Sequence, residues 1–322
     1  MEHGEGAKGR SPVNRAKISI ILVLSLFPAV FPSASHAAFG LAEAELQFRN
    51  DDGTATRAAG SHPGSLTTAF SLNTHVDPGG AEIDDGELKD LTIDLPPGFV
   101  GDRGATPYCT RSEFIERHEG RAGCADEAAV GIAAIKGDFK ALSPGAGDIF
   151  IHVPIYNLVP QPGVPAELGF VALNEPLTVE VGLSDSAPYH LVARATNITQ
   201  ALFLYKARIT AWGDPSSPIH DPLRGNCLSK EVTEFTAEPV SNGNCPVEAT
   251  KQAFLTMPRS CTGPLNGLFS AASWAAPRTP VVTSGFVSDD SVPPQALALE
   301  GCEQLGFSPE ISAGLSAPSV HT

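Results

Sequence analysis

Short segments in which every second residue is apolar recur along this chain, and they restrict its fold more than any other feature. The clearest spans residues 177–183, and a longer one spans residues 203–211. In the longer segment the odd-numbered residues are apolar, whereas Lys206, Arg208 and Thr210 would face water. A period of two is typical of a β-strand that has one buried face.

Nine strands of this kind are predicted between residues 43 and 212, separated by clusters of glycine, proline, asparagine and aspartate. Their approximate bounds are residues 45–49, 66–72, 91–95, 129–136, 149–156, 168–173, 177–183, 189–195 and 203–211. Many short strands between turn signals are typical of two-layered or Greek-key β proteins. We therefore predict a mostly β fold, either an antiparallel β-sandwich or a jelly-roll-like arrangement.

The composition changes after Trp212, because residues 213–222 are dense in proline, serine and aspartate. Such breakers are typical of a boundary between structural units. We predict a β-sandwich domain over residues 38–212. A cysteine-rich, loop-rich segment with a few short strands follows over residues 213–322, and its small and polar end, residues 308–322, is expected to be frayed.

The chain has six cysteines, and an even number in an exported chain predicts disulfides. They are Cys109, Cys124, Cys227, Cys245, Cys261 and Cys302. No two of them stand two to four residues apart, as the ligands of a structural zinc site would. Six cysteines allow 15 pairings, of which proximity most strongly favours Cys109 with Cys124. The same argument favours, less strongly, Cys227 with Cys245 and Cys261 with Cys302.

Thr110 and Glu113 fit a capping box, which predicts a short helix over residues 111–118.

Residues 1–37 have the three-part layout of a secretory signal peptide. The basic residues Lys8, Arg10, Arg15 and Lys17 come first, followed by an apolar run over residues 18–30 and by small residues that end at Ala37. Cleavage is expected between Ala37 and Ala38. The apolar run of about 13 residues is shorter than the roughly 20 that span a bilayer as a helix. We predict a secreted or cell-surface protein with no membrane span in the mature chain.

The formal net charge of −15 limits the class of partner. An acidic surface repels nucleic acid and anionic lipid. No nucleic-acid partner is therefore expected, and the partner stays unknown. A cell-wall glycan or another surface protein would be compatible with the predicted location.

Three acidic turns could contribute oxygen ligands to a calcium ion. They lie at residues 50–53, 84–87 and 289–290. Asp-Gly is also the commonest hairpin turn signal, so plain turns are favoured over metal sites. We predict no cofactor, and calcium stays open as an alternative.

No constellation of residues specifies a reaction. The chain has neither a Gly-x-Ser-x-Gly nor a His-Glu-x-x-His motif, which would position a nucleophile or a zinc-bound water. His220 and Asp221 could act as a base with its orienting carboxylate. Neighbours in sequence rarely face each other in this way, so a turn held by the aspartate is favoured. We predict no catalytic, cofactor-binding or metal-binding residue, and no enzymatic activity is inferred.

Six phrases of the sequence form a recognisable combination. They are AGSHP at residues 59–63, KDLTIDLPPG at 89–98, VPIYNL at 153–158, WGDP at 212–215, FLTMPRSCTGP at 254–264 and GCEQLGF at 301–307. Together they resemble a group of large, multi-module exported proteins of soil bacteria that are labelled hypothetical or uncharacterised. The resemblance covers most of residues 58–310 and implies export and cell-surface exposure, but it brings no catalytic residue.

Members of that group continue with further β modules after the equivalents of Gly301 and Cys302. This chain stops about 20 residues later. The resemblance therefore leaves two expectations open, a stand-alone module and a truncated reading frame.

Two functions follow as hypotheses. The first is an exported structural or interaction module that displays loops at the cell surface. The alternative is a secreted protein that binds or cleaves carbohydrate, which would show a concave face with exposed aromatic side chains or a cleft with two carboxylates. Only 7% of the residues are aromatic, and the two tryptophans, Trp212 and Trp274, are each expected to pack under a loop rather than bind sugar.

Overall fold

The computed structural model describes residues 38–80, 82–118, 121–138, 148–201, 203–229, 234–235 and 238–306. All of these residues belong to one compact unit. The predicted signal peptide, residues 1–37, and the predicted frayed end, residues 308–322, lie outside the described residues, so both stay predictions.

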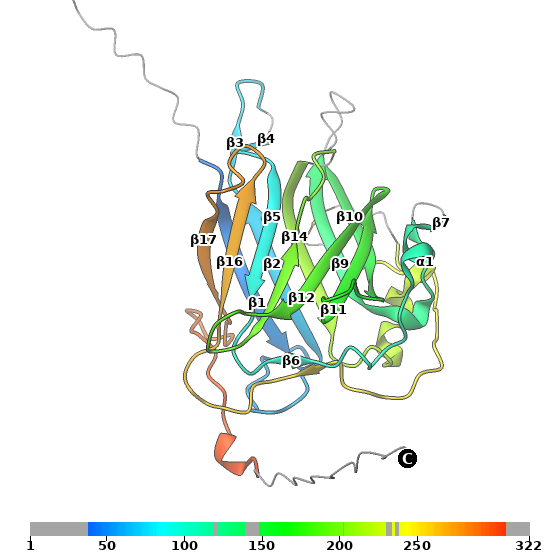
Figure 1. Cartoon of the computed structure of the whole chain (residues 1–322), viewed down its shortest axis with the longest axis vertical. Coiled ribbons are helices and arrows are strands. Elements are labelled where there is room, and N and C mark those ends of the chain that lie inside the picture. The colour runs from blue at the N-terminus through cyan, green and yellow to red at the C-terminus, as the bar shows by residue number, and fades with distance from the viewer. Residues whose placement is uncertain are drawn as a thin grey trace, which may run out of the picture. The chain divides into compact units, whose positions relative to one another are not determined.

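In the described part of the chain, eleven strands form one large antiparallel sheet (Figure 1). In their order across the sheet they are β1 (Leu41–Arg49), β2 (Ser65–Leu72), β14 (Phe203–Trp212), β9 (Ala129–Asp138), β10 (Ile149–Leu158), β11 (Ala166–Ala172), β12 (Glu175–Leu183), β13 (Leu191–Ala195), β5 (Leu88–Asp94), β16 (Asn266–Ser273) and β17 (Val281–Phe286). The prediction of a mostly β, antiparallel fold is confirmed. Each of the nine predicted strands overlaps a strand of this sheet.

The two ends of the sheet meet, because β1 and β17 lie side by side (Figure 1). Leu46 of β1 forms a parallel bridge with Val287, the residue directly after β17. Eleven strands that alternate in direction place the first and the last in the same orientation, so the seam has to be parallel. A Cβ atom at Gly285 would lie 3.1 Å from the Ala44 carbonyl oxygen and 2.7 Å from the Phe269 ring, so this close approach requires glycine.

The segment after residue 212 takes part in the same sheet. β16 pairs with β5 over residues 268–273, and β17 pairs with β16. The described part of residues 213–322 therefore contributes two strands to the sheet, besides loops. The change of composition at Trp212 does not separate two compact units.

Smaller elements surround the sheet. Three two-stranded pairs are β3 (Thr74–Val76) with β4 (Glu82–Asp84), β6 (Val100–Gly101) with β15 (Leu255–Thr256), and β7 (Arg117–His118) with β8 (Arg121–Ala122). The one α-helix among the described residues is α1 (Arg111–Ile115), and the 3-10 turns are η1 (Asp126–Ala128), η2 (Pro218–Leu223), η3 (Gly225–Cys227) and η4 (Cys302–Gln304). The predicted capping box of α1 is present, since the Thr110 hydroxyl accepts from the Glu113 amide and the Glu113 carboxylate accepts from the Thr110 amide.

The core has two parts. The larger cluster lies inside the rolled sheet and includes Leu46, Phe48 and Phe269, each almost fully buried. A smaller cluster covers the outer face of β9, β10 and β11. Its members include Phe114 of α1 and Tyr156 of β10. Short segments outside the sheet are thereby attached to it by apolar contacts.

Three disulfides are formed, and they are the pairings that proximity in the sequence favours. Cys109 is bonded to Cys124, Cys227 to Cys245 and Cys261 to Cys302. Their sequence separations are 15, 18 and 41 residues. All six cysteines lie outside the eleven strands of the sheet, so the disulfides fasten connecting segments rather than strands.

Candidate functional site

The inside of the rolled sheet is hollow on one side. A cavity of about 730 Å³ lies between strands β2, β5, β9, β10, β11, β12, β13 and β14. Its apolar lining comprises Leu66, Phe70, Leu91, Ile93, Leu95, Phe99, Ile135, Ile155, Val164, Pro165, Ala166, Leu168, Phe170, Leu177, Val179, Val181, Leu191, Ala193, Ala195, Ile198, Leu204, Ala207, Ile209, Ala211, Phe254 and Leu255. Small-molecule sites have volumes of roughly 300 to 1,000 Å³ and a mostly apolar lining, so the cavity is of the size and kind that bind one.

Strand alternation explains why so many apolar side chains converge. On β12, Leu177, Val179 and Val181 line the cavity, whereas the residues between them do not. Successive side chains of a strand point to opposite faces, so one face of each strand supplies the wall. Several of the inward side chains are small, among them Ala193 and Ala207, and a larger residue at these positions would reduce the space.

The alternation predicted for residues 203–211 holds for only part of β14. Ala207, Ile209 and Ala211 face the interior of the sheet, as predicted, and line the cavity. A register shift between Leu204 and Lys206 then reverses the pattern, so that Leu204 lines the cavity in place of its neighbours. The β-bulge turns the side chains before it to the other face, so Phe203 and Tyr205 do not line the cavity, although Tyr205 is buried elsewhere.

The other side of the interior is packed. Leu46 and Phe48 of β1 and Phe269 and Ala271 of β16 are buried and do not line the cavity. Proteins normally fill their interiors to the density of organic crystals. The interior near β1 and β16 is packed in this normal way, whereas the cavity is not, so the cavity differs from an ordinary core.

The cavity opens at one end. Its exposed lining residues are Gly101, Asp102, Arg103, Gly163 and Pro165. They belong to two neighbouring segments, the end of β6 with the turn after it and the turn that joins β10 to β11. We call the space between these two segments the mouth. Arg103 links them, since its guanidinium donates a hydrogen bond of 2.9 Å to the Pro165 carbonyl.

Buried polar contacts hold the mouth in place. The Asn157 side chain is buried and donates to the Arg103 carbonyl at 3.0 Å and to the Thr106 hydroxyl at 3.1 Å. The Asp102 carboxylate accepts from the Gln252 side chain at 2.7 Å and from the Gly104 amide at 2.8 Å. These bonds fix the backbone of the turn after β6, because they join it to β10 and to the segment around Gln252.

The connection between β13 and β14 lies at the far end of the cavity, where Ile198 and Thr199 line it. Ile198 is buried there, and its amide donates to the Lys89 carbonyl at 2.8 Å. The Trp274 indole donates to the Ile198 carbonyl at 2.9 Å. This tryptophan thus packs against a connecting segment, which is the arrangement expected for it.

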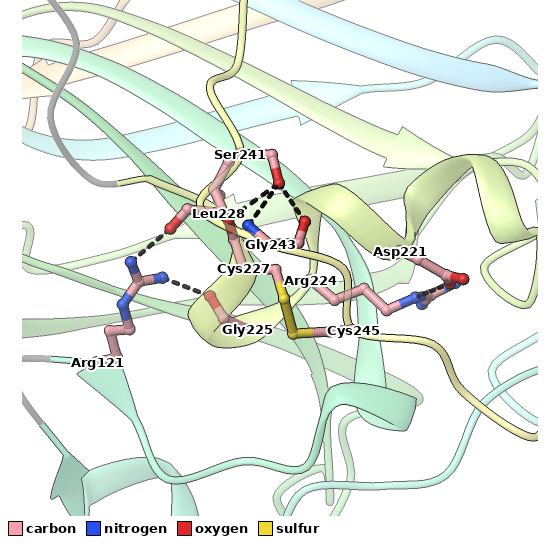
Figure 2. Close-up of a disulfide and its surroundings, with 9 residues drawn as sticks. All are labelled: Arg121, Asp221, Arg224, Gly225, Cys227, Leu228, Ser241, Gly243 and Cys245. Atoms are coloured by element: carbon pink, nitrogen blue, oxygen red, sulfur yellow. Dashed lines mark hydrogen bonds and ion pairs between the residues drawn. A yellow bond between two sulfur atoms is a disulfide. The ribbon is translucent and has the colours of Figure 1, made fainter.

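The sequence candidate His220 with Asp221 does not form a catalytic pair. The His220 ring stacks on Trp212 with the ring centroids 4.2 Å apart and the planes 6° from parallel. The Asp221 carboxylate instead accepts from Nε of the buried Arg224 at 3.1 Å (Figure 2). Burial lowers the pKa of His220 to about 4, so this histidine is a neutral packing residue.

The disulfide between Cys227 and Cys245 belongs to the same structural segment, as Figure 2 shows. The Arg121 guanidinium, on β8, donates to the carbonyls of Gly225 and Leu228 on either side of Cys227. These groups attach the segment after β14 to the outside of the sheet, which is a structural role.

The acidic turns are occupied by protein groups. Arg49 donates to the Gly53 carbonyl at 3.3 Å and forms an ion pair with Asp290, so it lies between two of the three turns. Within the third turn, Asp85 pairs with His75 at 2.8 Å. Among the described residues, no group of three or more histidine, cysteine or acidic side chains is arranged to hold a metal ion. Calcium binding is not tested by this arrangement and stays an open alternative.

A smaller hollow of about 370 Å³ is lined by Asp84, Glu87, Asp138 and Tyr205, together with other residues. The Tyr205 hydroxyl donates to the Asp138 carboxylate and to the Glu82 carbonyl. Burial raises the pKa of Asp84, and the nearby Glu87 carboxylate raises it further. Among the described residues, no group of three or more side chains at this hollow could hold a metal ion, and we assign the hollow no function.

No known family model matches the chain, and no significantly similar protein was found among curated sequences or among solved structures. In the described part of the chain, no helix is long and apolar enough to cross a membrane.

The cavity was not predicted from the sequence. Its apolar side chains were read as core, and alternation does not distinguish a filled interior from a hollow one.

Proposed function

We propose that this protein binds a small apolar molecule inside the rolled sheet. The observation that carries the proposal is the cavity of about 730 Å³, whose wall is apolar except near its mouth and at two threonines, Thr68 and Thr199. An empty cavity of this kind deprives the side chains of its wall of packing contacts on one side. A bound apolar molecule would restore those contacts and lose unfavourable contact with water.

Transport or storage of a poorly soluble molecule outside the cytoplasm is the role we infer. Three disulfides support an oxidising compartment, because such bonds persist mainly in exported proteins. Export itself rests on the predicted signal peptide and on the resemblance to exported bacterial proteins, and we retain both as parts of the proposal.

The experiment is a titration with N-phenyl-1-naphthylamine, a neutral dye that fluoresces in apolar surroundings. Saturable binding of one dye molecule per chain is expected. Ala193→Phe places a ring inside the cavity and should weaken dye binding, since the ring takes up part of the space that the dye would occupy. Thr178→Phe adds the same ring to β12, outside the cavity lining, and should leave dye affinity unchanged.

Circular dichroism verifies that both variants are folded. Ala195→Leu is a milder substitution in the cavity wall, and it replaces Ala193→Phe in the experiment if that variant does not fold. Unchanged dye affinity in a folded cavity variant would contradict the proposal. Equal losses in the inner and outer variants would do the same.

The surface interaction module stays a second proposal. The observation that favours it is a group of exposed apolar side chains on β16 and β17, namely Leu268, Val282 and Phe286, which are 40%, 54% and 46% exposed. Binding of labelled protein to cell-wall preparations, compared between wild type and Phe286→Ser, tests this idea. A loss of binding in the variant supports the module, and equal binding contradicts a role for these side chains.

Carbohydrate binding is less well supported as an alternative. The aromatic residues of the cavity are phenylalanines, and few polar groups are available there to bind sugar hydroxyls. Trp212 is buried against His220, so it offers no exposed platform.

A further inference from the structure

The charges of the cavity are confined to its mouth. Among the described residues of the lining, Asp102 and Arg103 are the only ones with ionisable side chains, and both are exposed. All charged parts of a bound molecule must lie at this end, because the apolar wall beyond it cannot solvate a charge.

The two mouth residues differ in how their charges are satisfied. The Asp102 carboxylate already accepts two hydrogen bonds, from Gln252 and Gly104. The Arg103 guanidinium donates to one uncharged group, the Pro165 carbonyl, and forms no ion pair with any described residue. A guanidinium has five N–H donors, so most of the donors of Arg103 are available to a ligand.

We propose that the ligand is amphipathic and anionic, with a hydrocarbon chain in the cavity and a carboxylate or a similar acid group at Arg103. The inference rests on the proposed function and names the chemical class of its ligand, a fatty acid or related lipid anion. Guanidinium groups suit this role, because their paired N–H groups match the two oxygens of a carboxylate.

The dimensions of the cavity fit a single chain. On β14 the lining runs from Leu204 to Ala211, which corresponds to roughly 20 Å at the rise of a β-strand. An extended hydrocarbon chain could lie along this direction with its acid group at the mouth. The Asp102 carboxylate beside Arg103 opposes an anion, so the gain from the head group is expected to be modest.

The test compares three ligands that share one chain and differ in head group: laurate, dodecan-1-ol and dodecylamine. Each displaces the neutral dye from the oxidised, full mature chain. Laurate should bind most tightly and the amine least. Arg103→Gln should weaken laurate binding by about fivefold, as expected for a solvent-exposed charged contact, and should leave dodecan-1-ol unchanged. Added salt should reduce the difference between laurate and the alcohol.

Arg194→Gln is the matched control. Arg194 lies on β13 between two residues of the cavity wall and does not line the cavity, so its loss should change no affinity. Equal binding of laurate and the alcohol, tighter binding of the amine, or an unchanged laurate affinity in Arg103→Gln would overturn the anionic head group while leaving the apolar site intact. If folded protein binds neither the dye nor any of the three ligands, the proposed function itself fails.

Discussion

The rings of Phe48 and Phe99 lie with their centroids 5.1 Å apart and their planes tilted by 55°. Phe48 belongs to the packed half of the interior, and Phe99 lines the cavity. The pair therefore forms part of the partition between the two halves. An aromatic contact of this kind contributes about 0.5 to 1.5 kcal/mol beyond the burial of the rings.

Removal of one ring from this partition should destabilise the protein and enlarge the cavity. We expect Phe99→Ala to lower the free energy of unfolding by about 3 kcal/mol, because the 3% exposed ring is lost and the space is not refilled. Urea unfolding measures the change. Phe286→Ala removes the same ring from an exposed position and should cost no more than about 0.5 kcal/mol. Similar losses in the two variants would argue against a closed partition at Phe99.

The stack of His220 on Trp212 predicts a dependence of stability on pH. The pKa of His220 is lowered to about 4 in the folded protein, mainly by burial, whereas an unfolded histidine titrates near 6.5. The unfolded state therefore binds a proton first as the pH falls, and stability is lost between about pH 6.5 and pH 4. The loss that His220 contributes should reach about 2 to 3 kcal/mol.

The measurement is the difference in unfolding free energy between wild type and His220→Phe across this pH range. The phenylalanine keeps a ring against Trp212 and cannot bind a proton. Other groups with shifted pKa values, such as Asp84 and Asp126, titrate in both proteins and cancel in the difference. A difference that does not change with pH would show that His220 is accessible to protons in the folded state.

The disulfide between Cys109 and Cys124 should stabilise the fold without affecting the cavity. It closes a loop with a sequence separation of 15 residues, which corresponds to about 3 kcal/mol in the chain-entropy model. The double substitution to alanine should lower the unfolding free energy by about this amount. Dye affinity should not change, because Cys109 packs in the smaller cluster outside the sheet. A loss of dye binding in the folded variant would show that the loop supports the cavity.

The seam between β1 and β17 should be the least protected part of the sheet. Among the described residues, one isolated bridge, between Leu46 and Val287, joins the two ends of the sheet. By contrast, β9 pairs along its length with both β10 and β14. Hydrogen exchange should therefore proceed faster in β17 than in β9. Equal protection of the two strands would indicate that the seam is more fully hydrogen-bonded than the single bridge suggests.

Much of the fold could be predicted from the sequence, because strands such as β12 alternate cleanly between apolar and polar residues. β16 and β17 were not predicted individually, and their composition explains why. Gly267 and Gly285 lie at inward positions where the backbone approaches neighbouring side chains closely, whereas the apolar Leu268 and Val282 lie on the exposed face. The usual relation between hydrophobicity and burial is therefore partly reversed in these two strands.

The candidate site was less predictable than the fold. Inward residues such as Val179 are apolar whether or not other side chains fill the space before them. The signal that could have indicated a hollow is the repeated alanine of β13 and β14, at Ala193, Ala195 and Ala207. Its meaning depends on which strands face one another across the interior, and that arrangement is a property of the whole sheet.

The seam also has a consequence for the order of events in folding. Leu46 lies near the start of the described chain, and its partner Val287 is more than two hundred residues further on. Contacts between such distant positions form late, because a long loop must first be closed. During synthesis, the chain therefore cannot complete its ring of strands until residue 287 has emerged. Until then β1 has a free edge, and a chaperone that covers this strand would protect the nascent protein from aggregation.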